Sequence, residues 1–261
     1  MMAAMATCLT GQVNGDDPVI EKARKAASAF TESLPKYLVK RITTRYQSNP
    51  EVCSPSAVKS GHGCQSAESW HTIDIISADV ATENGKEAYS NIRLNGNPAT
   101  DLERSGTWSE GEFSSTLWAI LSPESNASFT GQPVVTLEDR AVYRYEFSID
   151  QAHSSWRLYV TATGYAPAYG GAIWIDKETS RVLRVEMSAR SMPGSFPLTT
   201  VQSTVEYAFV KIADEDYLLP SHSEAIYCQR EGAICSRNAT DFRDYQKYTA
   251  DTTINFENPP E

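Results

Sequence analysis

Apolar and polar residues alternate most regularly in the second half of the chain. A short apolar segment ends at Ile175, a polar turn follows at 176–180, and then Leu183, Val185 and Met187 alternate with polar or charged residues. A period of two residues is typical of an antiparallel strand that is buried on one face and solvated on the other. The pattern therefore predicts a β-hairpin over 173–187.

One helix is predicted near the start of the chain, over residues 18–33. Asp16 or Asp17 is the expected N-cap, Pro18 occupies the first helical position, and Pro35 ends the helix. Apolar residues recur at helical spacing between these limits, so we expect one face of this helix to be buried.

A second helix is predicted over 109–121. Ser109 and Glu112 form the S-x-x-E pattern of a capping box. The apolar residues that follow at helical spacing are Phe113, Leu117, Trp118 and Leu121.

The other regular segments have the composition of strands. They are 37–47, 70–82, 86–94, 141–149, 155–163, 201–212, 217–219, 222–230 and a final pair within 235–256. The predicted fold is mostly β (α+β), a large curved antiparallel sheet or barrel covered by about two helices. We expect one domain over 17–257, a disordered segment over 1–16 that could be the remnant of an export signal, and a tail over 258–261.

Composition and motifs narrow the classes of function. The formal net charge is −10, which argues against binding to nucleic acid or to anionic membrane surfaces. No apolar run is long enough for a membrane-spanning helix. The four histidines lack metal-binding spacing, and there is no phosphate loop, G-x-S-x-G or dinucleotide motif. We therefore expect no metal, no cofactor and no catalytic residue. An enzyme would need a buried cluster of histidines and carboxylates that the sequence does not reveal.

Four of the five cysteines form two close pairs, Cys53/Cys64 and Cys228/Cys235. Each pair brackets a short polar loop, which suits a disulfide in an oxidising compartment. Zinc is the alternative because His62 lies near Cys64, but the cysteines lack the C-x₂-C spacing of zinc sites. We predict two disulfides.

Apolar residues of the strands and of the second helix share one side of the predicted sheet. They are either a filled core or the lining of an apolar cavity, because two helices cover a large sheet only modestly. The sequence leaves both interpretations open. The predicted lining residues are Phe113, Leu117, Trp118, Leu121, Tyr143, Tyr145, Phe147, Leu183, Val185, Met187, Tyr207 and Phe209.

Several of these segments resemble a family of exported bacterial proteins. The order of the elements, the segments 109–121 and 172–179, and the closing segment 241–248 resemble the LolA/LppX/RseB-like proteins, that is, outer-membrane lipoprotein-sorting proteins and their relatives, and especially uncharacterised acidobacterial members. The resemblance implies an unclosed half-barrel with helices as a lid over an apolar cavity, in the periplasm. Its motifs are structural, so it transfers the fold better than the function.

Two hypotheses of function follow. The first is a non-enzymatic envelope protein that binds a lipid or a lipoprotein acyl chain in a cavity between sheet and helices. The second is a regulatory or scaffolding module of the same fold that binds an envelope protein, in which case side chains should fill the interior.

Overall fold

The computed structural model of the chain describes residues 12–13, 17–33, 37–48, 70–83, 86–100, 108–109, 111–113, 115–131, 133–231 and 234–247. Antiparallel strands make up most of this part, and two α-helices accompany them. The predicted fold class, mostly β with about two covering helices, is confirmed.

Among the described residues the main sheet has 13 strands, and all of its pairings are antiparallel. In sheet order they are β1 (Gln12–Val13), β6 (Ser128–Gly131), β8 (Arg140–Ile149), β11 (Ala168–Asp176), β12 (Val182–Arg190), β13 (Leu198–Ile212), β14 (Glu215–Gln229), β15 (Cys235–Lys247), β2 (Tyr37–Ser48), β3 (Trp70–Glu83), β4 (Lys86–Leu94) and β5 (Asn97–Pro98). β7 (Val135–Leu137) pairs with β8 outside this order.

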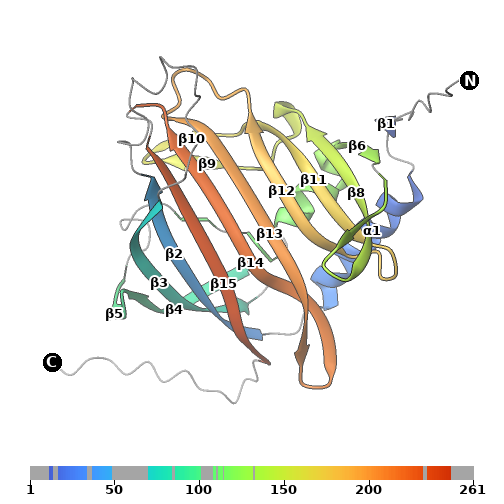
Figure 1. Cartoon of the computed structure of the whole chain (residues 1–261), viewed down its shortest axis with the longest axis horizontal. Helices are drawn as coiled ribbons and strands as arrows, with labels where there is room; N and C mark the ends of the chain where they lie inside the picture. Colours follow the sequence, from blue (N-terminus) through green and yellow to red (C-terminus); the bar gives the residue numbers. More distant parts are fainter. Residues whose placement is uncertain are drawn as a thin grey trace, which may run out of the picture.

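The sheet is curved and unclosed (Figure 1). Its two end strands, β1 and β5, are only two residues long, and short edge strands limit pairing with other chains. Near its middle the late strand β15 pairs with the early strand β2. The result is a half-barrel, as the resemblance implied.

Helix α1 (Pro18–Ser33) has the predicted bounds. Asp17 is its cap, since its side-chain oxygen accepts the Val19 amide at 2.7 Å. The second helix, α3 (Ser115–Leu121), is shorter than predicted. Both helices lie on one side of the sheet, behind β8, β11 and β12 (Figure 1). We call this side the inner face.

Two strand predictions needed correction. The segment 155–163 is not one strand, because Thr161 has a φ of 51° and the chain turns there between β9 (Leu158–Val160) and β10 (Thr163–Tyr165). Segments 217–219 and 222–230 are instead one strand, β14. Pro220 lies beside a register shift in β13, where a residue without an N–H is tolerated.

The register divides the inner face into two halves. Directly opposed residues on neighbouring antiparallel strands share a face, so one row runs across six strands through Ile173, Val185, Val205, Ser223, Thr240 and Thr43. We call the inner face of β6, β8, β11 and β12 the apolar half, and that of β14, β15, β2 and β3 the polar half. Strand β13 lies between them.

Candidate functional site

Most of the predicted lining residues meet in one packed cluster in the apolar half. Its buried members from the predicted set are Leu117, Leu121, Tyr145, Phe147, Leu183, Val185, Met187 and Tyr207, with Tyr143 packed against them. Ile20 and Ala23 of α1 and Ile120 of α3 complete the cluster. Phe113 lies instead in a second cluster, where its ring contacts Tyr37 and Phe242.

Two predicted lining residues do not face the interior. Trp118 is 57% exposed and Phe209 is 39% exposed. Each helical residue turns the chain by about 100°, so Trp118 lies off the stripe formed by Leu117, Ile120 and Leu121. Phe209 follows a register shift, beyond the paired part of β12, and lies against Arg140.

The space between helices and sheet is filled by side chains in the described part of the chain. A hollow of about 380 Å³ opens elsewhere, among polar residues that include Ser128, Arg144, Ser188 and Arg190. A second, of about 360 Å³, lies beside Lys40 and the end of β15. Neither of these two hollows lies under the helices, so neither is the expected apolar cavity.

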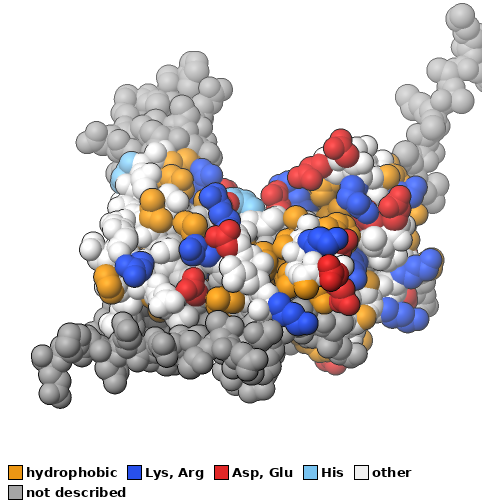
Figure 2. Space-filling model, turned by 90° about the horizontal axis from the view of Figure 1, so that it is seen from below, with side chains coloured by type: hydrophobic (Ala, Val, Ile, Leu, Met, Phe, Trp, Pro, Cys, Tyr) orange, Lys and Arg blue, Asp and Glu red, His pale blue; other side chains and the backbone are white. Residues whose placement is uncertain are grey.

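The half of the surface that carries β8, β11 and β12 displays basic and acidic side chains next to one another (Figure 2). Trp174 lies there between Arg144 and Arg184, and each guanidinium carbon is 5.4 Å from the centre of a Trp174 ring. Arg184 also pairs with Glu206 at 3.1 Å. Charges of both signs thus offset one another on this surface.

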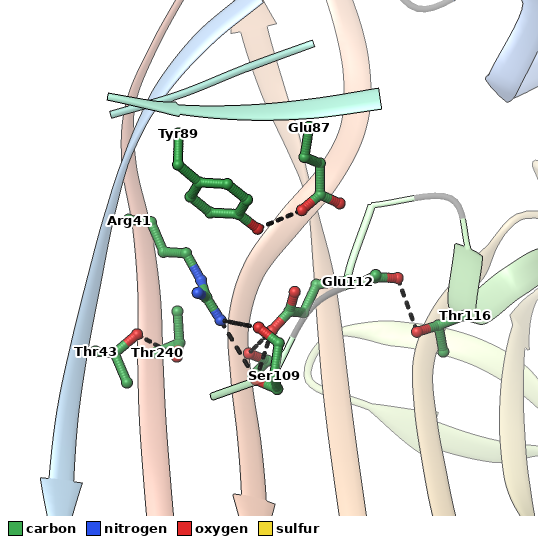
Figure 3. Close-up of polar contacts among 10 residues, drawn as sticks. Arg41, Thr43, Glu87, Tyr89, Ser109, Glu112, Thr116 and Thr240 are labelled. Atoms are coloured by element: carbon green, nitrogen blue, oxygen red, sulfur yellow. Dashed lines mark hydrogen bonds and ion pairs between the residues drawn. The ribbon is translucent and has the colours of Figure 1, made fainter. Parts of the chain in front are cut away.

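The polar half contains a buried charged cluster centred on Arg41 of β2 (Figure 3). The Nη2 atom of Arg41 donates to the Ser109 carbonyl at 2.8 Å and to Glu112 Oε1 at 2.9 Å. Ser109 Oγ donates to the same carboxylate oxygen at 3.0 Å, and Ser223 Oγ lies 3.4 Å from it. The Arg41 guanidinium carbon is 3.8 Å from the Trp108 ring centre, a close cation–π contact.

This cluster leaves hydrogen-bonding atoms unused. Arg41 is 1% exposed and Glu112 is 4% exposed. Nevertheless, Nε and Nη1 of Arg41 and Oε2 of Glu112 have no hydrogen-bond partner among the described residues. An unsatisfied buried polar group costs about 1–3 kcal/mol, so such a group in a native protein calls for an explanation.

Glu112 reaches Arg41 because of the residue before it. Ser109 and Glu112 do form their predicted side-chain hydrogen bond, but no helix begins there. Gly111 has a φ of 98°, a left-handed conformation that favours glycine, and the chain turns before α3. The Gly111 carbonyl then accepts the amide and the hydroxyl of Thr116 (Figure 3).

Three tyrosine hydroxyls of the inner face hold the elements that cover it. Tyr145 donates to Asp17 at 2.8 Å, Tyr169 to the Ala119 carbonyl at 2.7 Å, and Tyr207 to the Glu112 carbonyl at 3.0 Å. We call α1, α3 and the described residues of 108–113 the cover.

Three buried tyrosines near Glu112 and Arg41 are poor acids. Burial raises the pKa of Tyr207 and of Tyr227 well above the ordinary value of 10.0, and the nearby Glu112 charge adds to it. Burial also raises the pKa of Tyr89, although the Arg41 charge opposes that effect. These phenols therefore keep their protons at neutral pH and remain hydrogen-bond donors.

Of the two predicted disulfides, Cys228–Cys235 is present. Cys53 and Cys64 lie outside the described residues. The described residues contain no group of three or more His, Cys, Asp or Glu placed to hold a metal ion. None of the described helices is long and apolar enough to cross a membrane.

No family model and no curated protein matches this chain. Two solved structures are similar to it. A DUF1329 family protein from Desulfovibrio piger is 8% identical with a TM-score of 0.41, covering 90% of this chain and 95% of the other. A LolA superfamily protein from Nitrosomonas europaea is 11% identical with a TM-score of 0.37, covering 91% and 94%. The second comes from the superfamily to which the resemblance in the sequence pointed.

Proposed function

We propose that this protein is a non-enzymatic binding protein that holds a lipid or a lipoprotein acyl chain on the apolar half of its inner face. Supporting this is the continuous apolar surface of that half, where Tyr145, Ile173 and Val185 lie side by side on successive strands, and Val205 of β13 continues the row. Burial of apolar surface contributes about 25 cal/mol per Å², before the costs of ordering the ligand.

In the proposed mechanism, the cover moves away to admit the ligand. α1 and α3 now occupy the apolar half through Ile20, Leu117 and Ile120. Besides this apolar packing, the tyrosine hydrogen bonds attach the cover to the sheet. An acyl chain would replace the apolar contacts of the helices, while the strands keep their own pairing.

We also propose that the protein works in the periplasm or another exported location. The Cys228–Cys235 bond supports this, because disulfides persist in oxidising compartments.

The role of the cover is tested by removing three of its polar attachments. A Tyr145→Phe, Tyr169→Phe, Tyr207→Phe triple variant loses three hydrogen bonds worth about 1 kcal/mol each. Because apparent affinity scales with the open fraction, it should bind a fluorescent fatty acid up to about 100-fold more tightly than the wild type. Tyr159→Phe is the matched control, since Tyr159 is 71% exposed, and should bind as the wild type does.

A wild-type protein that binds the fatty acid no less tightly than the triple variant would show that the cover is not the gate. If neither protein binds it, the proposal of lipid binding fails.

A regulatory or scaffolding module that binds an envelope protein is the second candidate. The observation that favours it is the packing of the apolar half, where buried side chains of helices and strands form one cluster among the described residues. Under this alternative, fatty acids should not bind to either protein in the experiment above.

A further inference from the structure

Only part of the hydrogen-bonding capacity of the Arg41 guanidinium is used within the described residues. Within the part of the chain that the structure describes, its side-chain hydrogen bonds come from Nη2, which contacts Ser109 and Glu112, whereas Nε and Nη1 have no partner there. The guanidinium group is a planar fork suited to gripping a carboxylate or a phosphate with two parallel hydrogen bonds. Its contact with Glu112 engages only one carboxylate oxygen.

The neighbouring Arg45 shows what a complete pair looks like in the same strand. Its Nε donates to Asp74 Oδ1 at 2.6 Å and its Nη2 donates to Asp74 Oδ2 at 2.5 Å. Both partners belong to the sheet, Arg45 to β2 and Asp74 to β3. The incomplete pairing of Arg41 is therefore a local feature and not a general property of the polar half.

The partner of Arg41 belongs to the cover and not to the sheet. Glu112 is held through its carbonyl by Tyr207, one of the attachments that must break when the cover moves. Without Glu112, the sheet keeps the Arg41 guanidinium and the Ser223 hydroxyl, both of which now contact Glu112 Oε1. These are donors suited to an anion.

This group of donors adjoins the apolar half. Ser223 lies directly opposite Val205, which lies opposite Val185, and Ile173 follows on the next strand. Ser223 is on β14 and Ile173 is on β11, so three strand spacings, roughly 14 Å, separate these two residues along the row. An amphiphile with its head at Arg41 could lay its chain along this row.

We propose that Arg41 and Ser223 bind the anionic headgroup, a carboxylate or a phosphate, of the ligand, and that Glu112 occupies this position in the free protein. This inference rests on the proposed acyl-chain binding and adds a class of headgroup to it. When the ligand is bound, its headgroup would accept hydrogen bonds from Nε and Nη1 of Arg41, which have no partner among the described residues.

The test compares three ligands with the same chain: dodecanoate, dodecyl phosphate and 1-dodecanol, each competing with a fluorescent fatty acid. The wild type should bind at least one of the two anions about tenfold or more tightly than the alcohol. Arg41→Gln should bind all three with the affinity of the alcohol. Arg45→Gln, which removes the other buried arginine, should keep the preference for the anion.

Glu112→Gln provides a readout that does not depend on Arg41→Gln folding. Loss of the internal carboxylate should raise the affinity for the anions severalfold and leave that for dodecanol nearly unchanged. A purely structural Arg41–Glu112 pair would give equal changes for all three ligands. Inorganic phosphate alone should compete far more weakly than dodecyl phosphate.

The outcomes separate the two proposals. Equal binding of the three ligands by the wild type, a preference that survives Arg41→Gln, or weaker anion binding by Glu112→Gln would overturn the headgroup site while acyl-chain binding stands. Competition by inorganic phosphate as strong as by dodecyl phosphate would reduce the site to one for a free ion. Failure of all three ligands to bind would overturn both proposals.

Discussion

In the apolar half of the inner face, the side chains of α1 and α3 fill the space over β8, β11 and β12. In the polar half of the same sheet, Arg41 meets Glu112 of the cover and leaves donors unpaired. Apolar contacts between well-fitting side chains stabilise the apolar half. The polar half depends on a charged pair whose members belong to different parts of the chain. The contrast teaches that burial alone does not define a core, because Arg41 and Glu112 are as buried as the apolar cluster, yet some of their hydrogen-bonding atoms have no partner among the described residues.

The largest expected effect concerns the charged pair. Arg41→Met leaves the Glu112 carboxylate buried without a cation, so the free energy of unfolding should fall by about 3–5 kcal/mol. The double variant Arg41→Met, Glu112→Leu removes both charges and should recover most of this loss. Denaturant unfolding of the wild type, both single variants and the double variant measures the coupling.

A residue of the apolar half provides the control for this double-mutant cycle of Arg41 and Glu112. Phe147 is 2% exposed in the packed cluster, and Phe147→Ala should cost about 3–5 kcal/mol through lost contacts and the remaining cavity. A double variant of Arg41 and Glu112 as unstable as Arg41→Met alone would refute the contrast between the two halves.

A smaller effect concerns the turn between β11 and β12. Burial alone would raise the pKa of Asp176, but hydrogen bonds from Arg140 at 2.7 Å and the Thr179 amide at 2.8 Å hold it at about 2. The folded pKa lies below the ordinary value of 3.8. The resulting stabilisation, about 2 kcal/mol, is therefore complete above pH 3.8 and disappears as the pH falls through 2.

Asp176→Asn should accordingly lower the free energy of unfolding at neutral pH by about this amount, and the difference from the wild type should shrink below pH 3.8. Denaturant unfolding across this pH range checks it. Glu178→Gln, at a side chain 85% exposed in the same turn, should change stability little at any pH. A constant difference between Asp176→Asn and the wild type down to pH 2 would contradict the assignment.

The sequence predicted the apolar half better than the polar half. Alternation identified Leu183, Val185 and Met187 as one face, and all three are buried. Arg41 was missed because strand 37–48 has no clear apolar face beyond Tyr37 and Val39, and a buried arginine is rare without a visible partner. The signal was the same parity of Tyr37, Val39 and Arg41, which places Arg41 on the buried face.

Distant residues account for the remaining differences. The capping-box pattern was read as the start of a helix, but Arg41, 71 positions away in sequence, takes the Glu112 carboxylate, and Gly111 turns the chain. Neither effect can be predicted from the short sequence segment around Ser109 and Glu112 alone. Whether the apolar face is filled or hollow depends on how far the helices reach, which residue spacing does not determine.

The most direct test of acyl-chain binding is native mass spectrometry of the protein purified gently from its own host. The account predicts a population heavier than the bare chain by the mass of one lipid or of one lipoprotein, converted to the bare mass by extraction with organic solvent. A bare mass alone, together with no binding of a fluorescent fatty acid by the purified protein, would contradict it.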